Sequence, residues 1–134
     1  MKYRIVEGTE NIPTADVARL LKTTYWANQR SLETIETSMR HSACFGVIAE
    51  DLNELVGFAR VISDDVTTYY LCDVVIDPAH QGQGLGKTLV SHIVSSPRYA
   101  PLRGLLLTRD AHGLYQKFGF EAAEGRAMVK RPDR

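Results

Sequence analysis

The 134-residue sequence predicts one α/β domain, built on a mixed, largely antiparallel central sheet with about four flanking helices. The length suits one ordinary domain, and the hydrophobic share of 44% and charged share of 24% lie near globular averages. Apolar residues recur with the strand and helix periods in the order β, α, α, three β, α, β, α, β. A strand-helix-strand crossover usually makes a parallel pair and a hairpin an antiparallel one, so the sheet is expected to be mixed.

The first 40 residues predict one strand and two helices. Tyr3 to Glu7 alternates like a strand, and Thr14 after Pro13 is the expected cap of the first helix. Ser31 is the expected cap of the second helix. The predicted buried faces of the two helices comprise Val17, Leu20, Leu21, Leu32, Ile35 and Met39.

Three strands are predicted next. Ala43 to Glu50 and Leu55 to Ser63 are rich in Val, Ile and Phe, and the polar residues 51–54 between them indicate an antiparallel hairpin. Thr67 to Asp77 is the longest β-prone run, which Pro78 ends because proline cannot donate to a ladder. This run is predicted to be a central strand.

The last third of the chain returns to helical periodicity. An amphipathic helix is predicted from Leu85, and Pro97 stops it. Gly104 to Thr108 is predicted as a short strand, Ala111 to Phe118 as a short helix, and Met128 to Lys130 as a final strand. The whole range 1–134 is therefore expected to form a single domain.

The charge balance and the cysteines exclude several classes of protein. Sixteen basic residues balance sixteen acidic ones, so no bulk field favours nucleic acid or anionic lipid as a partner. No run approaches the roughly 20 apolar residues of a membrane span, and no signal peptide is visible, which predicts a cytoplasmic protein. Cys44 and Cys72 lie in apolar, strand-like runs, so a disulfide is not expected.

The segment that joins the predicted central strand to the amphipathic helix carries the main functional signal. Gly82, Gly84 and Gly86 alternate there and would expose consecutive backbone N–H groups at a helix start, where the macrodipole also favours a phosphate. The structural alternative is a glycine-rich turn. Glycine weakens a helix by about 1 kcal/mol relative to alanine, which disfavours a purely structural role for three of them.

Two common phosphate-binding motifs do not fit this loop. A Walker loop needs a glycine five residues before Gly86, where this chain has Gln81. A dinucleotide fingerprint starting at Gly82 or Gly84 would need its third glycine at Lys87 or Leu89. Both motifs fail on spacing.

The pattern Gln-x-x-Gly-x-Gly, made by Gln81, Gly84 and Gly86, resembles the GNAT superfamily of N-acetyltransferases. A second stretch, residues 108–120, resembles the family's last strand and helix, with Ala, Leu-Tyr and Gly-Phe in the family's order, although many relatives have asparagine at the position of Thr108. The resemblance implies that acetyl-coenzyme A is the acetyl donor. It also implies that the pyrophosphate is bound by Gln81, Gly82, Gln83, Gly84, Leu85, Gly86 and Lys87, and the pantetheine arm by Val74, Val75 and Ile76.

Two residues are candidates for the proton transfers of such a reaction. Tyr115 occupies the family's general-acid position, although a core tyrosine is the structural alternative. An amine with a pKa of about 10.4 must lose a proton to a carboxylate or a water chain. Asp73 is the first candidate because it interrupts an apolar run, where burial would raise its pKa; the alternative is that it accepts structural hydrogen bonds. The resemblance also implies a backbone N–H near Val75 that stabilises an oxyanion, without a metal.

The acceptor is expected to be a small-molecule primary amine. In the family the acceptor meets the first two helices and their connection, where Tyr25 and Trp26 would wall an amine pocket or simply pack. Arg60 would suit an acceptor with a carboxylate or be a surface arginine. A peptide or protein amine, a non-catalytic acyl-coenzyme A sensor and a nucleotide-binding protein are the alternatives, and a homodimer is left open.

Overall fold

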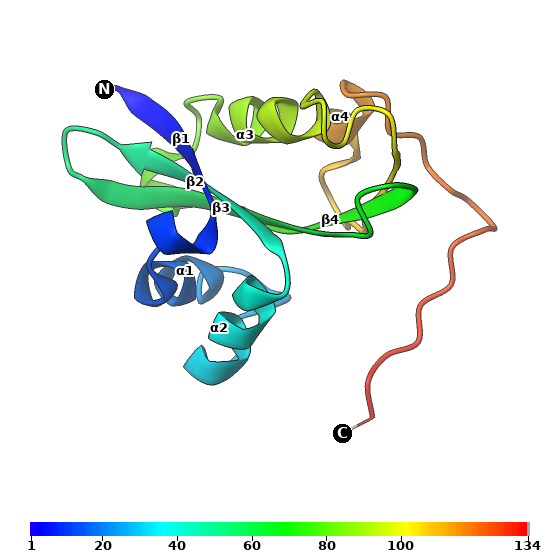
Figure 1. Ribbon diagram of the computed structural model, residues 1–134, viewed down its shortest axis with the longest axis horizontal. Coiled ribbons are helices and arrows are strands. Elements are labelled where there is room, and N and C mark those ends of the chain that lie inside the picture. The colour runs from blue at the N-terminus through cyan, green and yellow to red at the C-terminus, as the bar shows by residue number, and fades with distance from the viewer. Residues whose placement is uncertain (134) are drawn as a thin grey trace.

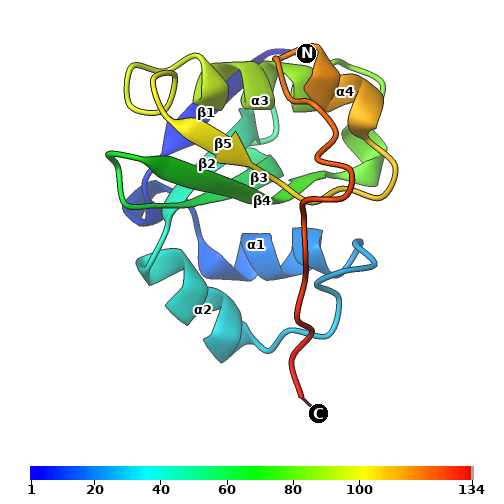
Figure 2. The same cartoon turned by 90° about the vertical axis from the view of Figure 1, so that its right-hand side faces the viewer.

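The computed structural model describes residues 1–133, which form a five-stranded sheet with helices on both faces (Figures 1 and 2). The strands lie in the order β1-β2-β3-β4-β5, with the first three pairings antiparallel and β4 parallel to β5. The predicted α/β fold is confirmed; Arg134, at the end of the predicted domain, lies outside the described residues. The strands are β1 (Tyr3–Glu7), β2 (Ala43–Ala49), β3 (Glu54–Ser63), β4 (Thr68–Ile76) and β5 (Arg103–Leu105).

Within residues 1–133, four α-helices and two 3-10 turns flank the sheet. In Figure 2, α1 and α2 lie below the sheet and α3 and α4 above it. Each face buries its own apolar core, one centred on Val17 and Phe58 and the other on Leu89 and Val61. No helix among residues 1–133 is long and apolar enough to cross a membrane. The helical elements are η1 (Thr9–Asn11), α1 (Thr14–Leu21), α2 (Leu32–Arg40), η2 (Pro78–His80), α3 (Leu85–Val94) and α4 (His112–Gln116).

The two N-terminal helices begin in different ways. Thr14 was expected to cap α1, and this is wrong: Pro13 is the N-cap, no side chain caps the helix, and Thr14 is its first residue. Pro13 takes the extended conformation of an N-cap residue and so shifts the start of the helix by one position. Ser31 caps α2 as predicted, because its Oγ accepts a hydrogen bond from the backbone N–H of Thr34 at 3.1 Å.

Removal of the Ser31 cap is expected to destabilise the protein modestly. Ser31→Ala leaves the N–H of Thr34 without its protein acceptor, which should lower the free energy of unfolding by about 1 kcal/mol. Urea denaturation measures this change. Ser31→Asp restores an acceptor and is the control, so equal stability of the two variants would contradict the capping role.

A bulge in β4 decides which side chains of this strand face which helices. Phe58 pairs with Val75 but Arg60 pairs with Cys72, so β4 has one extra residue at this point. Asp73 has the positive φ of 54°, which a non-glycine residue rarely adopts. The extra residue shifts the alternation of side chains by one position. Residues an even number of positions apart across the bulge therefore face opposite layers of helices instead of the same layer.

The C-terminal strand predictions need two corrections. The strand expected over residues 104–108 is only Arg103–Leu105, because its pairing with β4 ends at Tyr70 and the chain then diverges. The strand expected over 128–130 is absent: Met128 and Val129 are exposed and have no ladder partner among residues 1–133. A turn at residues 123–126 directs this segment away from the sheet, and a short β-prone run without a neighbouring strand does not form a ladder.

Candidate functional site

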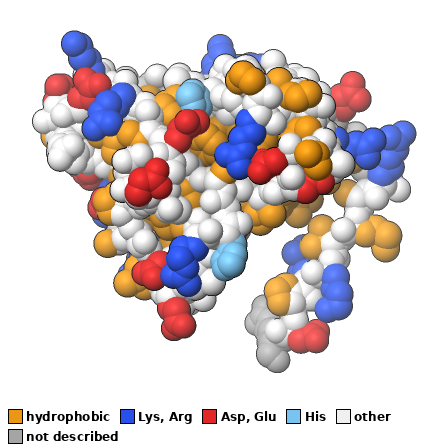
Figure 3. Space-filling model, viewed as in Figure 1, with side chains coloured by type: hydrophobic (Ala, Val, Ile, Leu, Met, Phe, Trp, Pro, Cys, Tyr) orange, Lys and Arg blue, Asp and Glu red, His pale blue; other side chains and the backbone are white. Residues whose placement is uncertain are grey.

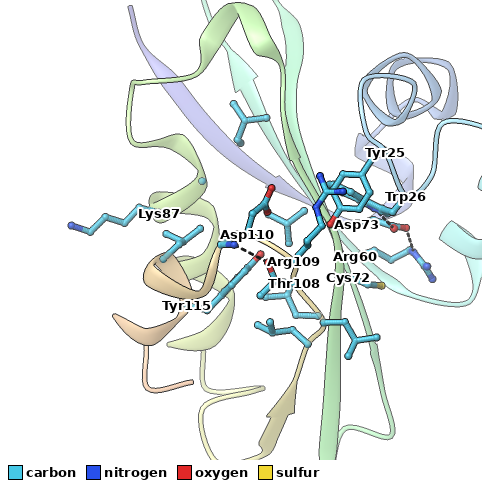
Figure 4. Close-up of a pocket in the computed structure, with 18 of the residues that line it drawn as sticks. Tyr25, Trp26, Arg60, Cys72, Asp73, Lys87, Thr108, Arg109, Asp110 and Tyr115 are labelled. Atoms are coloured by element: carbon cyan, nitrogen blue, oxygen red, sulfur yellow. Dashed lines mark hydrogen bonds and ion pairs between the residues drawn. The ribbon is translucent and has the colours of Figure 1, made fainter. Parts of the chain in front are cut away.

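A cavity of about 1240 Å³ lies where β4 and β5 diverge. Its walls come from the α1–α2 connection, β3, β4, the glycine-rich loop with the start of α3, the segment 106–111, α4 with Lys117, and the C-terminal residues 129–132. In Figure 4, Lys87 lies toward one end and Asp73 toward the other, with Tyr115 between them. A longer pairing between β4 and β5 would close this space, so the short β5 leaves the cavity open.

The glycine-rich loop presents unpaired backbone donors at the start of α3. Gly84 is the N-cap with φ 75°, and no side chain caps the helix. Thr88 is the first residue whose N–H bonds back, to the carbonyl of Gly84 at 3.0 Å. The N–H groups of residues 85–87 precede that bond and lack an intrahelical acceptor. A side chain at Gly82 or Gly84 would meet nothing within 4 Å, so the positive φ angles of 84° and 75°, rather than crowding, favour glycine there.

Most of the residues predicted to bind the cofactor line this cavity. Val75 and Gln83 do not. The β4 bulge turns the Val75 side chain into the core beneath α1 and α2, and the Gln83 side chain is exposed outside the cavity. The predicted residues that do line the cavity are Val74, Ile76, Gln81, Gly82, Gly84, Leu85, Gly86 and Lys87.

The carboxylate of Asp73 is buried at the end of the cavity opposite Lys87, where it accepts hydrogen bonds from three side chains. Its Oδ2 accepts hydrogen bonds from Arg30 at 2.7 Å and Arg60 at 2.9 Å, and its Oδ1 accepts one from the indole N–H of Trp26 at 3.3 Å. Burial raises the pKa of Asp73, but the hydrogen bond and charge of Arg30, together with Arg60, outweigh it and lower the pKa. The expectation of a raised pKa is therefore wrong.

The predicted acceptor residues Tyr25 and Trp26 both line the cavity. Their rings contact edge to face with centroids 5.0 Å apart. Arg109, from the segment that precedes α4, places its guanidinium 3.7 Å from the Tyr25 ring centroid, within the range of a cation–π contact. This contact joins two segments that approach the cavity from opposite sides (Figure 4).

Tyr115 is buried on α4 and faces the cavity beside Leu114. Burial, followed by the charge of Asp110, raises the pKa of Tyr115 to about 12, so its hydroxyl is protonated at neutral pH. Within residues 1–133 this hydroxyl makes no hydrogen bond to the protein. It is therefore available to donate to a group in the cavity.

Sequence reasoning missed several cavity residues. Arg30 gave only a weak signal, as the last residue of a polar link, and its pairing with Asp73 depends on the fold. Arg109 and His80 adjoin the recognised motifs, yet no sequence pattern distinguished them from surface residues. Thr108 accepts a hydrogen bond from the N–H of Ala111 at 3.0 Å and so supports the start of α4.

The cavity combines an uncapped, glycine-rich helix start, which suits a phosphate, with a protonated tyrosine, and both features suit an acyltransferase that uses a coenzyme A thioester. The sequence model of the Acetyltransferase (GNAT) family matches residues 14–120. The chain belongs to this family, whose members generally use acetyl-coenzyme A, and it is an acetyl-coenzyme A-dependent N-acetyltransferase.

Two relatives match most of this chain but are longer. The Uncharacterized N-acetyltransferase ycf52 of Porphyra purpurea is 30% identical over 125 residues, which are 90% of this chain and 71% of the relative. Histone acetyltransferase TAP1 of Glycine max is 31% identical over 117 residues, which are 86% of this chain and 47% of the relative. This chain therefore spans about half to 70% of such relatives.

One relative bears on localisation and one solved structure on the fold. GCN5-related N-acetyltransferase 2, chloroplastic, of Arabidopsis thaliana is 39% identical over 71 residues, 52% of this chain and 28% of the relative. The cytoplasmic location thus stays a prediction. A GNAT-family acetyltransferase of Xanthomonas campestris pv. campestris has a TM-score of 0.89 and 32% identity, covering 99% of this chain and 94% of that one.

Proposed function

We propose that this enzyme acetylates the primary amine of a small molecule by direct attack, within a single domain spanning residues 1–134. The observation that carries the proposal is the cavity itself, which holds the unpaired N–H groups of residues 85–87 and the hydroxyl of Tyr115 together. A diphosphate suits the helix start because the donors and the macrodipole both favour negative charge. Val74 and Ile76 lie along the cavity between that end and Asp73.

In the proposed reaction the neutral amine attacks the acetyl carbonyl carbon, a C–N bond forms and the C–S bond breaks. The amine loses one proton and the departing sulfur gains one or keeps its charge. Because the pKa of Asp73 is lowered, we assign the amine proton to water and give Asp73 the role of positioning Arg30 and Arg60. Tyr115 would stabilise the departing sulfur.

Hydrogen bonding, not complete proton transfer, is the contribution that we assign to Tyr115. With a pKa of about 12 for the phenol and about 8.5 for a thiol, full transfer would be uphill by about 5 kcal/mol. A hydrogen bond from the phenol avoids that cost and still stabilises charge that develops on sulfur.

Replacement of Gly86 by alanine is expected to raise the stability of the protein but to weaken its binding of coenzyme A. This residue lies in the first turn of α3, and an added Cβ would meet only Ile76, at an ordinary 3.8 Å. Gly86→Ala should therefore raise the free energy of unfolding by up to about 1 kcal/mol. The methyl group would hold a phosphate away from the backbone N–H groups, and loss of one such charge-assisted bond should raise the Kd for coenzyme A about tenfold.

Gly113→Ala is the matched control for this experiment, because Gly113 is also helical, has open space for a Cβ and does not line the cavity. Thermal denaturation and calorimetric titration with coenzyme A measure the two effects. Unchanged affinity in Gly86→Ala would contradict the proposed binding loop.

The activity itself is tested by release of coenzyme A thiol from acetyl-coenzyme A with a panel of small primary amines. Release that depends on the amine and yields the N-acetyl product is expected. Tight cofactor binding without acceptor-dependent release would instead favour a sensing role and contradict the proposal.

A protein amine is the second candidate, because one relative is named a histone acetyltransferase. The charges of the cavity argue against a lysine-rich target: six Lys or Arg side chains and two Asp side chains line it. Such a lining repels a basic peptide. Acetylation of a histone-tail peptide at a higher kcat/KM than of every small amine would favour this candidate.

A further inference from the structure

The cavity is cationic although the chain as a whole is neutral. Sixteen basic and sixteen acidic residues balance over the sequence, and Figure 3 shows both signs interspersed on one face of the molecule, but basic residues outnumber acidic ones in the cavity lining. Phosphates of the cofactor would meet the basic residues at the α3 end, which leaves the excess at the Asp73 end without a partner. The basic residues of the lining are Arg30, Arg60, Lys87, Arg109, Lys117 and Arg131, and the acidic ones are Asp73 and Asp110.

At the Asp73 end, two guanidinium groups share one carboxylate. Arg30 donates through Nη1 and Arg60 through Nε, both to the same oxygen of Asp73. Arg60 Nη1 also donates to Ser42 Oγ at 3.0 Å. Asp73 neutralises only one of the two positive charges, and the side chains of Arg30 and Arg60 stay 29% and 12% exposed. Both arginines line the cavity.

Within residues 1–133, several of these donors have no acceptor. Nε and Nη2 of Arg30 and Nη2 of Arg60 make no hydrogen bond, although both groups are held in place through Asp73. One arginine paired with Asp73 would be enough to fix the α1–α2 connection to the sheet. The second charge and the open donors indicate a ligand.

Arg109 adds a third guanidinium from the other side of the cavity. Its guanidinium carbon Cζ lies 3.7 Å from the centroid of the Tyr25 ring. Stacking occupies one face of a guanidinium and leaves the N–H groups at its edge open, and within the described chain Arg109 donates to no acceptor. The Tyr25 ring contacts Trp26, whose indole N–H donates to Asp73, so Arg109 lies at the same end of the cavity as Asp73 (Figure 4).

We propose that the acceptor carries a carboxylate or a phosphate near the amine that is acetylated, and that Arg30, Arg60 and Arg109 bind this anionic group. The proposal rests on the proposed function and names its class of acceptor. Guanidinium groups match both anions with paired, charge-assisted hydrogen bonds. The excess positive charge also disfavours the protonated form of a nearby amine and so favours the neutral nucleophile.

The first test compares acceptors that differ in the anionic group. One pair is an α-amino acid and its amide; the other is an amino sugar phosphate and the unphosphorylated amino sugar. Thiol release should give a kcat/KM at least about tenfold higher for the charged member of one pair, and that pair identifies carboxylate or phosphate. Neutral members that react equally well or better in both pairs would overturn the proposal.

The second test uses Arg109→Gln, with Arg40→Gln as the control. Arg40 pairs with Glu36 on the exposed side of α2 and does not line the cavity. Arg109→Gln should raise the KM for the charged acceptor about tenfold, so that the preference for the charged over the neutral acceptor falls by about that factor, while the KM for acetyl-coenzyme A stays within about twofold. An equal loss for charged and neutral acceptors would indicate a structural role and overturn the assignment of Arg109.

The two proposals fail in distinguishable ways. If no amine in the panel supports thiol release, the proposed acetyl transfer to small amines is wrong. If amines are acetylated without preference for the anionic member, the proposed function stands and only the anionic acceptor is rejected.

Discussion

Replacement of Tyr115 by phenylalanine is expected to lower kcat about 100-fold, the lower end of the usual effect of a positioned proton donor. The variant removes only the hydroxyl, and the ring retains its edge-to-face contact with Phe120, whose centroid lies 6.0 Å away. The Kd for coenzyme A should change less than about threefold, because the phosphates are expected to bind at the α3 end. Steady-state kinetics and calorimetric titration measure the two quantities.

Tyr69→Phe is the matched control, because Tyr69 is another buried tyrosine but does not line the cavity. It should leave kcat within about twofold if its fold is intact. An unchanged kcat in Tyr115→Phe would remove the proposed role and leave Tyr115 as a core residue.

The second large effect is expected at Asp73, and it concerns stability. Asp73→Asn keeps an oxygen acceptor and tolerates the positive φ of 54°, but it leaves Arg30 and Arg60 side by side without a compensating charge. Breaking a largely buried ion pair costs about 3 kcal/mol at the lower end of the known range. The cost lies at the lower end of this range because both arginines keep some contact with water. Urea denaturation at neutral pH measures the loss.

The stability that Asp73→Asn removes is expected to be smaller at acidic pH than at neutral pH. The pKa of Asp73 is lowered in the folded state, so its ionised form stabilises the fold above the ordinary pKa of about 3.9. This contribution is lost as the pH falls through the lower folded value. The difference in unfolding free energy between the natural protein and Asp73→Asn should therefore be constant at neutral pH and shrink below about pH 4.

Asp65→Asn is the control for Asp73→Asn. Asp65 also has a positive φ, of 66°, and pairs with an arginine, Arg98, but this pair is exposed. Because water screens an exposed ion pair, its loss should lower the free energy of unfolding much less than the loss of the Asp73 charge. Equal effects of the two variants would contradict the view that burial and the shared carboxylate make Asp73 important.

The sequence predicted the elements best where the signal is local. The glycine-rich loop and the start of α3 were predicted correctly, because helix starts and glycine conformations depend on a few neighbouring residues. The Ser31 cap followed from the same local chemistry. The strand expected over 128–130 was wrong, since a strand also needs a partner and the path of residues 123–126 removes it.

In the candidate site, too, the local features were predicted and the contacts between distant segments were not. The tyrosine on α4 and most of the loop line one cavity, but the bulge at Asp73 turns Val75 away from it. Asp73 itself lies in the cavity with a lowered rather than a raised pKa. Burial was foreseeable from the apolar run; the two arginines beside the carboxylate were not.

By itself, the sequence determined the class of fold, the family resemblance and the glycine-rich start of α3, because periodicity and glycine spacing act over short stretches of chain. Only the tertiary structure decided where β4 and β5 separate, that Arg30 and Arg60 both contact Asp73, and that Arg109 contacts Tyr25. The residues joined by these contacts are up to 84 positions apart in the sequence. Their charges interact strongly only at a few ångströms, a distance that the packing of the helices and the sheet alone sets.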